Sequence, residues 1–160
     1  MLRYISYDIV FREIPGEVTL ALNLTGCPYR CRGCHSPHLR DDTGEALTGE
    51  ALAALLCAYG DAVTCVCFMG GDGAPADVVR LAALVRRAHK KTAWYSGSPV
   101  LFDGAPAVFD YIKIGAYIEA LGGLDSPTTN QRLYRIENGE MRDITEKLRI
   151  TNYELRLTPN

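Results

Sequence analysis

Short stretches in which apolar residues alternate with polar ones, or follow one another directly, recur along the first two thirds of the chain and predict β-strands. They occupy residues 3–10, 18–24, 62–69, 92–95 and 108–114. Two further segments carry apolar residues at helical spacing. One begins after Thr48 and ends near Gly60, and the other begins at Pro75 and ends near Ala88. Strands that alternate with helices in this way predict an α/β fold built on a mainly parallel sheet.

The last third of the chain has a different pattern. Residues 132–136 and 140–144 resemble two strands on either side of Asn138-Gly139, which is the strongest sequence signal for a two-residue hairpin turn. A complete (β/α)8 barrel needs about 250 residues, whereas this chain has 160. We therefore expect an open sheet or partial barrel of about five or six mainly parallel strands, with a C-terminal hairpin.

Composition and length are those of an ordinary globular protein, and they predict a single domain covering residues 1–160. The 17 Lys and Arg residues nearly balance the 19 Asp and Glu residues, and there is no basic block, so nucleic acid is not expected as a partner. No apolar run is long enough to span a membrane, and the first residues lack the pattern of an export signal. We expect a cytoplasmic protein with reduced cysteines.

Three of the six cysteines lie close together in the long polar stretch that follows the second predicted strand. Cys27, Cys31 and Cys34 have the spacing C-x3-C-x2-C. Thiolates gathered in a short loop are typical of metal sites, because the thiolate is the form that binds metal. The other three cysteines, Cys57, Cys65 and Cys67, fall in predicted helix or strand and are expected to be buried thiols.

Three interpretations of this cysteine cluster remain open. Cys31-Arg-Gly-Cys34-His35 matches the C-x-x-C-H pattern of c-type haem attachment, although that chemistry belongs outside the cytosol. Three cysteines with His35 or His38 would make a closed structural zinc site. A [4Fe–4S] cluster held by only three cysteines would leave one iron open to a ligand from outside the protein, as catalytic metal sites require.

On these residues the chain resembles the radical S-adenosylmethionine (SAM) superfamily, in which a C-x3-C-x2-C motif follows the first strand of a βα series. It is similar in particular to the activases that generate a glycyl radical on anaerobic ribonucleoside-triphosphate reductase. The more specific motifs are the setting YRCRGCH around Cys31, Met69-Gly-Gly-Asp72, Tyr95-Ser-Gly97 and the segment GGLDSPTTNQR at 122–132. The resemblance implies a partial (β/α) barrel of the radical SAM type.

The resemblance also implies roles for individual residues. Cys27, Cys31 and Cys34 would hold the [4Fe–4S] cluster, and Gly70-Gly71-Asp72 would contact the amino group of SAM. The superfamily more often has glutamate where this chain has Asp72, whose side chain is one methylene shorter. Further residues expected around SAM are Tyr29, His35, Tyr95, Ser96 and Lys113.

The activity implied is that of an oxidoreductase that cleaves SAM and acts on another protein. The expected partners are the large subunit of anaerobic ribonucleoside-triphosphate reductase, which is the glycyl-radical enzyme, and an electron donor such as a flavodoxin. Two alternatives remain: a compact radical SAM enzyme that acts on a small molecule, like the deazapurine-forming synthases, and a zinc-stabilised interaction module with no catalytic activity.

Overall fold

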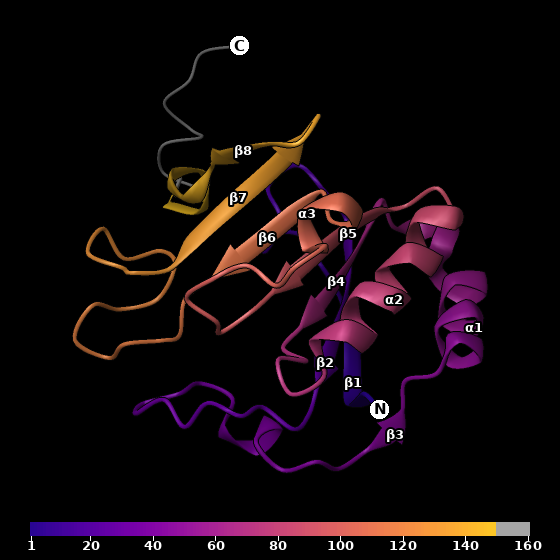
Figure 1. The fold of residues 1–160 in the computed structure, drawn as a ribbon, viewed down its shortest axis with the longest axis horizontal. Coiled ribbons are helices and arrows are strands. Elements are labelled where there is room, and N and C mark those ends of the chain that lie inside the picture. Colours follow the sequence, from indigo (N-terminus) through magenta and orange to yellow (C-terminus); the bar gives the residue numbers. More distant parts are fainter. Residues whose placement is uncertain (150–160) are drawn as a thin grey trace.

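The computed structural model describes residues 1–149 of the chain. Within this range the chain forms one sheet of eight strands, in the order β3-β1-β2-β4-β5-β6-β7-β8 (Figure 1). The strands are β1 (Arg3–Val10), β2 (Thr19–Leu24), β3 (Glu45–Ala46), β4 (Cys65–Met69), β5 (Lys91–Tyr95), β6 (Tyr111–Ile114), β7 (Arg132–Glu137) and β8 (Glu140–Asp143). The helices are α1 (Gly49–Tyr59), α2 (Pro75–Arg87) and α3 (Ala105–Val108), with 3-10 turns at η1 (Pro37–Leu39), η2 (Gly60–Ala62) and η3 (Thr145–Arg149). None of the helices in this range is long and apolar enough to cross a membrane.

The predicted α/β class is confirmed, but the number and direction of the strands are corrected. The four central strands β2, β4, β5 and β6 are parallel to one another, as the βα pattern predicts. Strands β3 and β1 on one side, and β7 and β8 on the other, add antiparallel pairs, so four of the seven strand pairs in the described residues are antiparallel. The sheet begins at β3 and ends at β8 without closing.

The direction of β1 follows from the length of its connection to β2. The segment between the two strands contains no helix, and a parallel pair needs a crossover of about a dozen residues or more. The short connection therefore forces β1 to pair antiparallel with β2. The predicted C-terminal hairpin is confirmed: Glu137 pairs with Glu140, and both turn residues, Asn138 and Gly139, adopt the positive φ that a two-residue turn demands.

The two faces of the sheet have different covers. Helices α1, α2 and α3 lie on one side (Figure 1), where a large apolar cluster joins them to the sheet through residues such as Leu22, Phe68 and Trp94. A smaller cluster lies on the opposite face and contains Ile14 together with the buried Cys65 and Cys67. Ile14 belongs to the β1–β2 connection, so this connection covers part of the face that the helices leave free.

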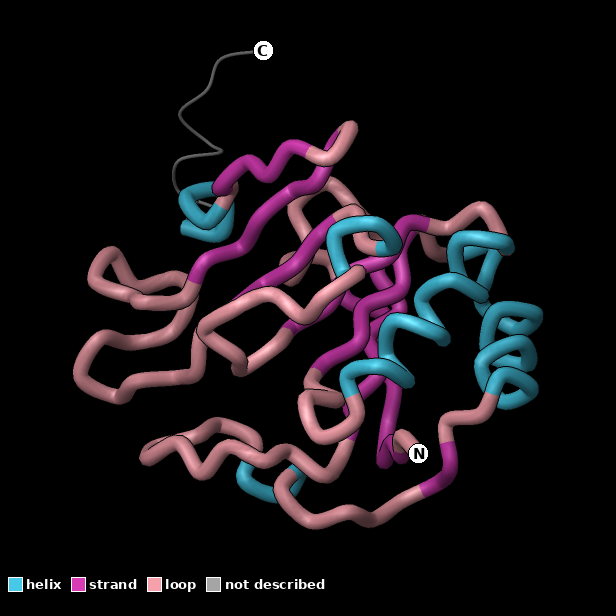
Figure 2. The backbone as a smooth tube through the Cα atoms, viewed as in Figure 1, coloured by secondary structure: helices cyan, strands magenta, loops and turns pink. Residues whose placement is uncertain are grey.

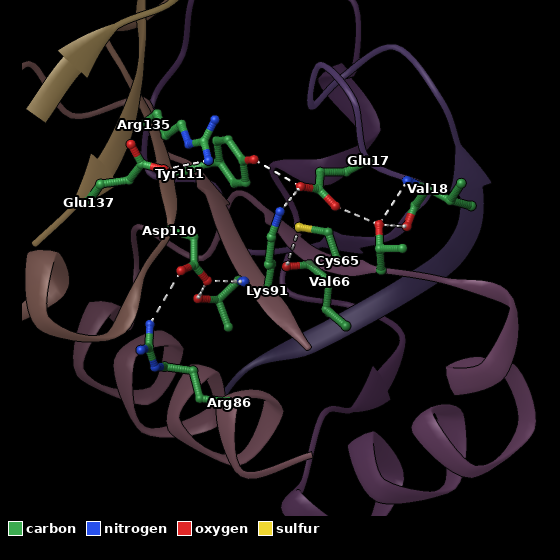
Figure 3. Close-up of polar contacts among 12 residues, drawn as sticks. Glu17, Val18, Cys65, Val66, Arg86, Lys91, Asp110, Tyr111, Arg135 and Glu137 are labelled. Carbon is green, nitrogen blue, oxygen red and sulfur yellow. Dashed lines mark hydrogen bonds and ion pairs between the residues drawn. The ribbon is translucent and has the colours of Figure 1, made fainter. Parts of the chain in front are cut away.

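A buried carboxylate anchors the end of the same connection (Figure 3). Glu17 is only 7% exposed and accepts hydrogen bonds from Thr64 Oγ1, at 2.6 Å, from the hydroxyl of Tyr111, at 2.9 Å, and from the ammonium group of Lys91. Burial raises the pKa of Glu17, but these hydrogen bonds lower it by more, so the pKa lies below its usual value. A buried carboxylate with three donors stabilises the fold in its ionised form.

We expect Glu17→Gln to destabilise the protein by about 1–2 kcal/mol at neutral pH, since an amide cannot accept all three hydrogen bonds. The effect is limited to this size because half of the Lys91 side chain is exposed, and solvent weakens its ion pair with Glu17. Because the folded pKa of Glu17 is depressed, its contribution is complete above the unfolded value and is lost as the pH falls through the folded value. Urea unfolding of both proteins at pH 7 and at lower pH measures this. If the difference in unfolding free energy between the two proteins stayed constant as the pH fell, Glu17 would not be the ionised acceptor of these hydrogen bonds.

Candidate functional site

The candidate site lies where the four parallel strands end. Because carboxyl ends of parallel strands meet at one edge of a sheet, the loops that follow β2, β4, β5 and β6 come together there. The long connections 25–44 and 115–131 both extend from this edge (Figure 2). Every residue that the sequence placed at the site lies in one of these loops or at the end of one of these strands.

The cysteine loop is held by hydrogen bonds to its own backbone. The N–H of Cys27 donates to the carbonyl of Leu39 at 3.0 Å, and the guanidinium of Arg40 donates to the carbonyl of Cys31 at 2.7 Å. The N–H of Ser36 lies 3.4 Å from Cys34 Sγ and donates to it. The loop thus has a defined shape, and one of its sulfurs already has the kind of N–H contact that tunes the potential of iron–sulfur clusters.

The three thiols are free and half-buried. Burial raises the pKa of Cys27, and the negative charges of Asp72, Cys31 and Cys34 raise it further. A bound metal reverses this effect, because coordination deprotonates a thiol outright. Soft sulfur donors in one short loop fit an iron–sulfur cluster.

The geometry does not favour a single zinc ion at this loop. In the part of the chain that the structure describes, no three His, Cys, Asp or Glu side chains lie near enough to one another to hold one ion. A mononuclear zinc site needs its sulfurs about 2.3 Å from a common centre, whereas a cluster places its ligands at separate corners. His35 is exposed, and its ring packs against that of Tyr117 with centroids 5.1 Å apart.

An open cleft of about 630 Å³ adjoins Cys34, on the face of the sheet that the helices do not cover. Its volume lies in the range of small-molecule sites, about 300–1,000 Å³. Three residues predicted to surround SAM line it, namely His35, Tyr95 and Lys113. The other lining residues are Arg12, Glu13, Cys34, Ser36, Tyr117, Gly123, Leu124, Asp125, Gln131 and Leu148.

Lys113 is the buried cation of this cleft. It is 8% exposed, and its ammonium group donates to the carbonyl of Ser96 at 3.1 Å and to that of Gly115 at 2.8 Å. Burial lowers the pKa of Lys113 to about 8, although the negative charge of Asp72 opposes this change. Because an ammonium group has three N–H donors, one donor remains for a ligand in the cleft.

Tyr95 forms a wall of the cleft rather than offering a free hydroxyl. Its hydroxyl donates to the carbonyl of Glu13, and burial raises its pKa well above the usual value. The ring therefore stays neutral, and it fixes the β1–β2 connection against the end of β5. This contact also explains how Arg12 and Glu13 come to line the cleft.

Three further predicted residues, Tyr29, Asp72 and Ser96, line a smaller hollow of about 160 Å³ on the other side of this edge. Gly70 and Gly71 line neither space. The carbonyl of Gly70 accepts the indole N–H of Trp94 at 2.8 Å, and a Cβ on Gly71 would lie 2.6 Å from Val78 Cγ2. The structure thus divides six of the eight residues predicted around SAM between two spaces, and it gives Gly70 a hydrogen bond and Gly71 a packing contact.

Sequence reasoning missed some cleft residues and misplaced one cysteine. Arg12 and Glu13 reach the cleft from a connection whose path no local pattern predicts, and the only signal was their interruption of an apolar stretch. Cys57 is exposed on α1, so the expectation that it is a buried thiol was wrong, whereas Cys65 and Cys67 are buried as expected. The buried residues of α1 are Leu52 and Leu55, and Cys57 lies on the helix outside this apolar face.

Together, these features define an α/β protein with a three-cysteine loop beside a ligand-sized cleft. A family model described as a 4Fe-4S single cluster domain matches residues 15–106, which is more than half of the chain and includes all three loop cysteines. The chain belongs to this family of single-cluster 4Fe-4S domains. A search among curated proteins returned no significant match.

Proposed function

We propose that the protein is a radical SAM activase that generates a glycyl radical on anaerobic ribonucleoside-triphosphate reductase. The observation that carries this proposal is the cleft beside Cys34, because a cluster with three cysteine ligands is open at one iron, and a ligand for that iron needs space next to the loop. Without such a space, a 4Fe-4S domain would be expected to transfer electrons only.

In this proposal Cys27, Cys31 and Cys34 hold the cluster. When bound, the cluster supplies one electron for reductive cleavage of SAM, which is chemistry that protein side chains cannot perform. The chain contributes the loop geometry, the N–H of Ser36 on Cys34 Sγ, and the partial burial of Cys27. The sulfurs bind as thiolates, so proton loss from each thiol accompanies assembly.

The charges in the cleft suit the amino-acid end of SAM, which carries both an ammonium and a carboxylate group. Lys113 and Arg12 offer positive charge for the carboxylate, and Glu13 and Asp125 offer negative charge for the ammonium. Lys113 is the stronger candidate of the two cations, since it is buried, held in place by two carbonyls, and left with one free N–H.

Support for the reductase as partner comes from the segment 122–132, which carries the most specific resemblance to the activases. Gly123, Leu124, Asp125 and Gln131 of this segment line the cleft, and Gln131 Nε2 donates to the carbonyl of Gly115 at 3.1 Å. We propose that the open cleft admits the glycine-bearing loop of the reductase. An electron donor such as a flavodoxin would reduce the cluster, and the cytoplasm, where thiols stay reduced, is the proposed location.

The test is an anaerobic incubation of the reconstituted protein with SAM, a reductant and the large subunit of an anaerobic ribonucleoside-triphosphate reductase, followed by electron paramagnetic resonance. A glycyl radical that forms on the reductase only when the reconstituted protein, SAM and the reductant are all present supports the proposal. Consumption of SAM without a radical on any reductase would replace it by a small-molecule radical SAM activity. Purified protein containing one zinc and no iron would overturn the cluster assignment itself.

A further inference from the structure

The carboxylate of Asp72 has a partner on each oxygen. Oδ1 accepts the hydroxyl hydrogen bond of Ser96, and Oδ2 accepts the backbone N–H of Gly97 at 3.0 Å. Asp72 follows β4, and its two donors follow β5, so the side chain ties one strand-end loop to the next. The hydroxyl of Ser96 in turn accepts the N–H of Ser98 at 3.0 Å, which extends the link along the second loop.

Gly97, held by Asp72, is in contact with the cysteine loop. A Cβ at Gly97 would lie 2.6 Å from Cδ2 and 2.8 Å from Cε2 of the Tyr29 ring, so the ring rests directly against the bare backbone of the glycine. Tyr29 lies between Cys27 and Cys31 in the sequence, and its carbonyl accepts a hydrogen bond from Cys27 Sγ at 3.7 Å. The contacts therefore run from Asp72 through Gly97 to the Tyr29 ring, and the backbone joins Tyr29 to Cys27 on one side and to Cys31 on the other, whether the cysteines are thiols or bound thiolates.

We propose that Asp72 is a positioning residue, which holds the Cys27–Cys31 part of the loop in its cluster-binding shape by fixing Gly97 under the Tyr29 ring. This role requires that the loop cysteines hold the cluster, but it requires neither SAM nor a partner protein. It differs from the role implied by the resemblance, in which the same residue contacts the amino group of SAM.

The experiment measures how fast the cluster is lost from the anaerobically reconstituted protein after addition of an iron chelator, without SAM, from the decay of visible absorbance. We expect Asp72→Ala to lose its cluster about tenfold faster than the wild type, because two charge-assisted hydrogen bonds disappear. Asp72→Asn keeps an acceptor for Gly97 and a polar partner for Ser96, so it should restore the rate to within about twofold. Asp103→Ala, an exposed carboxylate in the connection after β5, is the matched control.

A double-variant cycle tests the path through Tyr29. If Asp72 acts through that ring, adding Asp72→Ala to Tyr29→Ala should accelerate cluster loss by less than about twofold. The spectrum of the reduced cluster in paramagnetic resonance should change in the same way in both single variants. Should Asp72→Ala fail to fold, Ser96→Ala removes one of the two donors and leaves the carboxylate intact, and it should accelerate loss about threefold.

Three results would overturn the proposal: an unchanged rate in Asp72→Ala, single-variant effects that multiply in the double variant, or an Asp72→Asn protein that keeps its cluster but binds SAM far more weakly. The last result would assign Asp72 to the ammonium group of SAM. A failure of the proposed activase function would show itself differently, as the absence of a glycyl radical from a protein whose chelation rates still follow the expected order.

Discussion

Cys31→Ala abolishes cluster assembly, and with it every reaction that depends on the cluster; this is the largest effect we expect from any single substitution. Only three thiolates of the loop are available as ligands, so the variant keeps two, which cannot hold a cube that normally has four protein ligands. The backbone of the loop should persist, because Arg40 bonds to the carbonyl of residue 31 rather than to its side chain. Iron and sulfide should fall from about four of each per chain to less than one.

Iron and sulfide analysis after anaerobic reconstitution measures this directly, and chromatography of SAM cleavage products gives a second readout. Cys57→Ala is the matched control, since it removes an exposed thiol on α1 and should leave both readouts at wild-type level. Wild-type cleavage by Cys31→Ala would show that the ligand assignment is wrong. Loss of iron in Cys57→Ala would show that a fourth cysteine takes part in assembly.

Gly97→Ala should have the second largest effect. The new methyl group would overlap the Tyr29 ring, whose Cδ2 and Cε2 atoms lie 2.6 and 2.8 Å from the ideal Cβ position. The ring is not a flexible chain end, so the clash moves the cysteine loop. Overpacking of this kind costs about 1–3 kcal/mol, and we expect cluster loss to accelerate by at least about tenfold as the loop leaves its ligating shape.

Gly60→Ala provides the comparison for Gly97→Ala, because a Cβ at Gly60 meets only Lys90 Cε at an ordinary 3.9 Å. The chelation rate and the thermal unfolding midpoint should both stay near wild type in this control. A Gly97→Ala protein with a wild-type chelation rate would mean that the Tyr29 ring can move without disturbing the cysteines. In that case the contact between these residues serves packing alone.

The local elements of the fold were predictable because their signals are local. Thr48 was expected to begin a helix, and its hydroxyl accepts the N–H of Ala51 at 3.1 Å, as an N-cap does. The hairpin at Asn138-Gly139 likewise follows from two residues that tolerate positive φ. The direction of each strand was harder to predict, since it depends on how each connection crosses the sheet. Strand β3 was not predicted because its two residues are too few for a periodic signal.

The candidate site was predictable in outline but not in detail. Parallel strands bring their carboxyl ends together, so the loops with Cys31, Asp72 and Ser96 had to lie near one another. Which space each side chain enters depends on contacts far apart in the sequence, such as the bond from the Tyr95 hydroxyl to the carbonyl of Glu13. No periodicity distinguishes Lys113, which enters the cleft, from Asp72, which turns toward the next loop.

The exposed position of Cys57 gives the protein a single natural labelling site once the cluster is in place. In the proposed assembly the three loop thiols are bound to iron, while burial raises the pKa of Cys65 and Cys67 and keeps them from alkylating reagents. Among the six cysteines, all of which lie in the described part of the chain, Cys57 is thus the one that a maleimide reaches. A fluorophore or spin label attached there would report on the approach of a partner protein without any engineered cysteine.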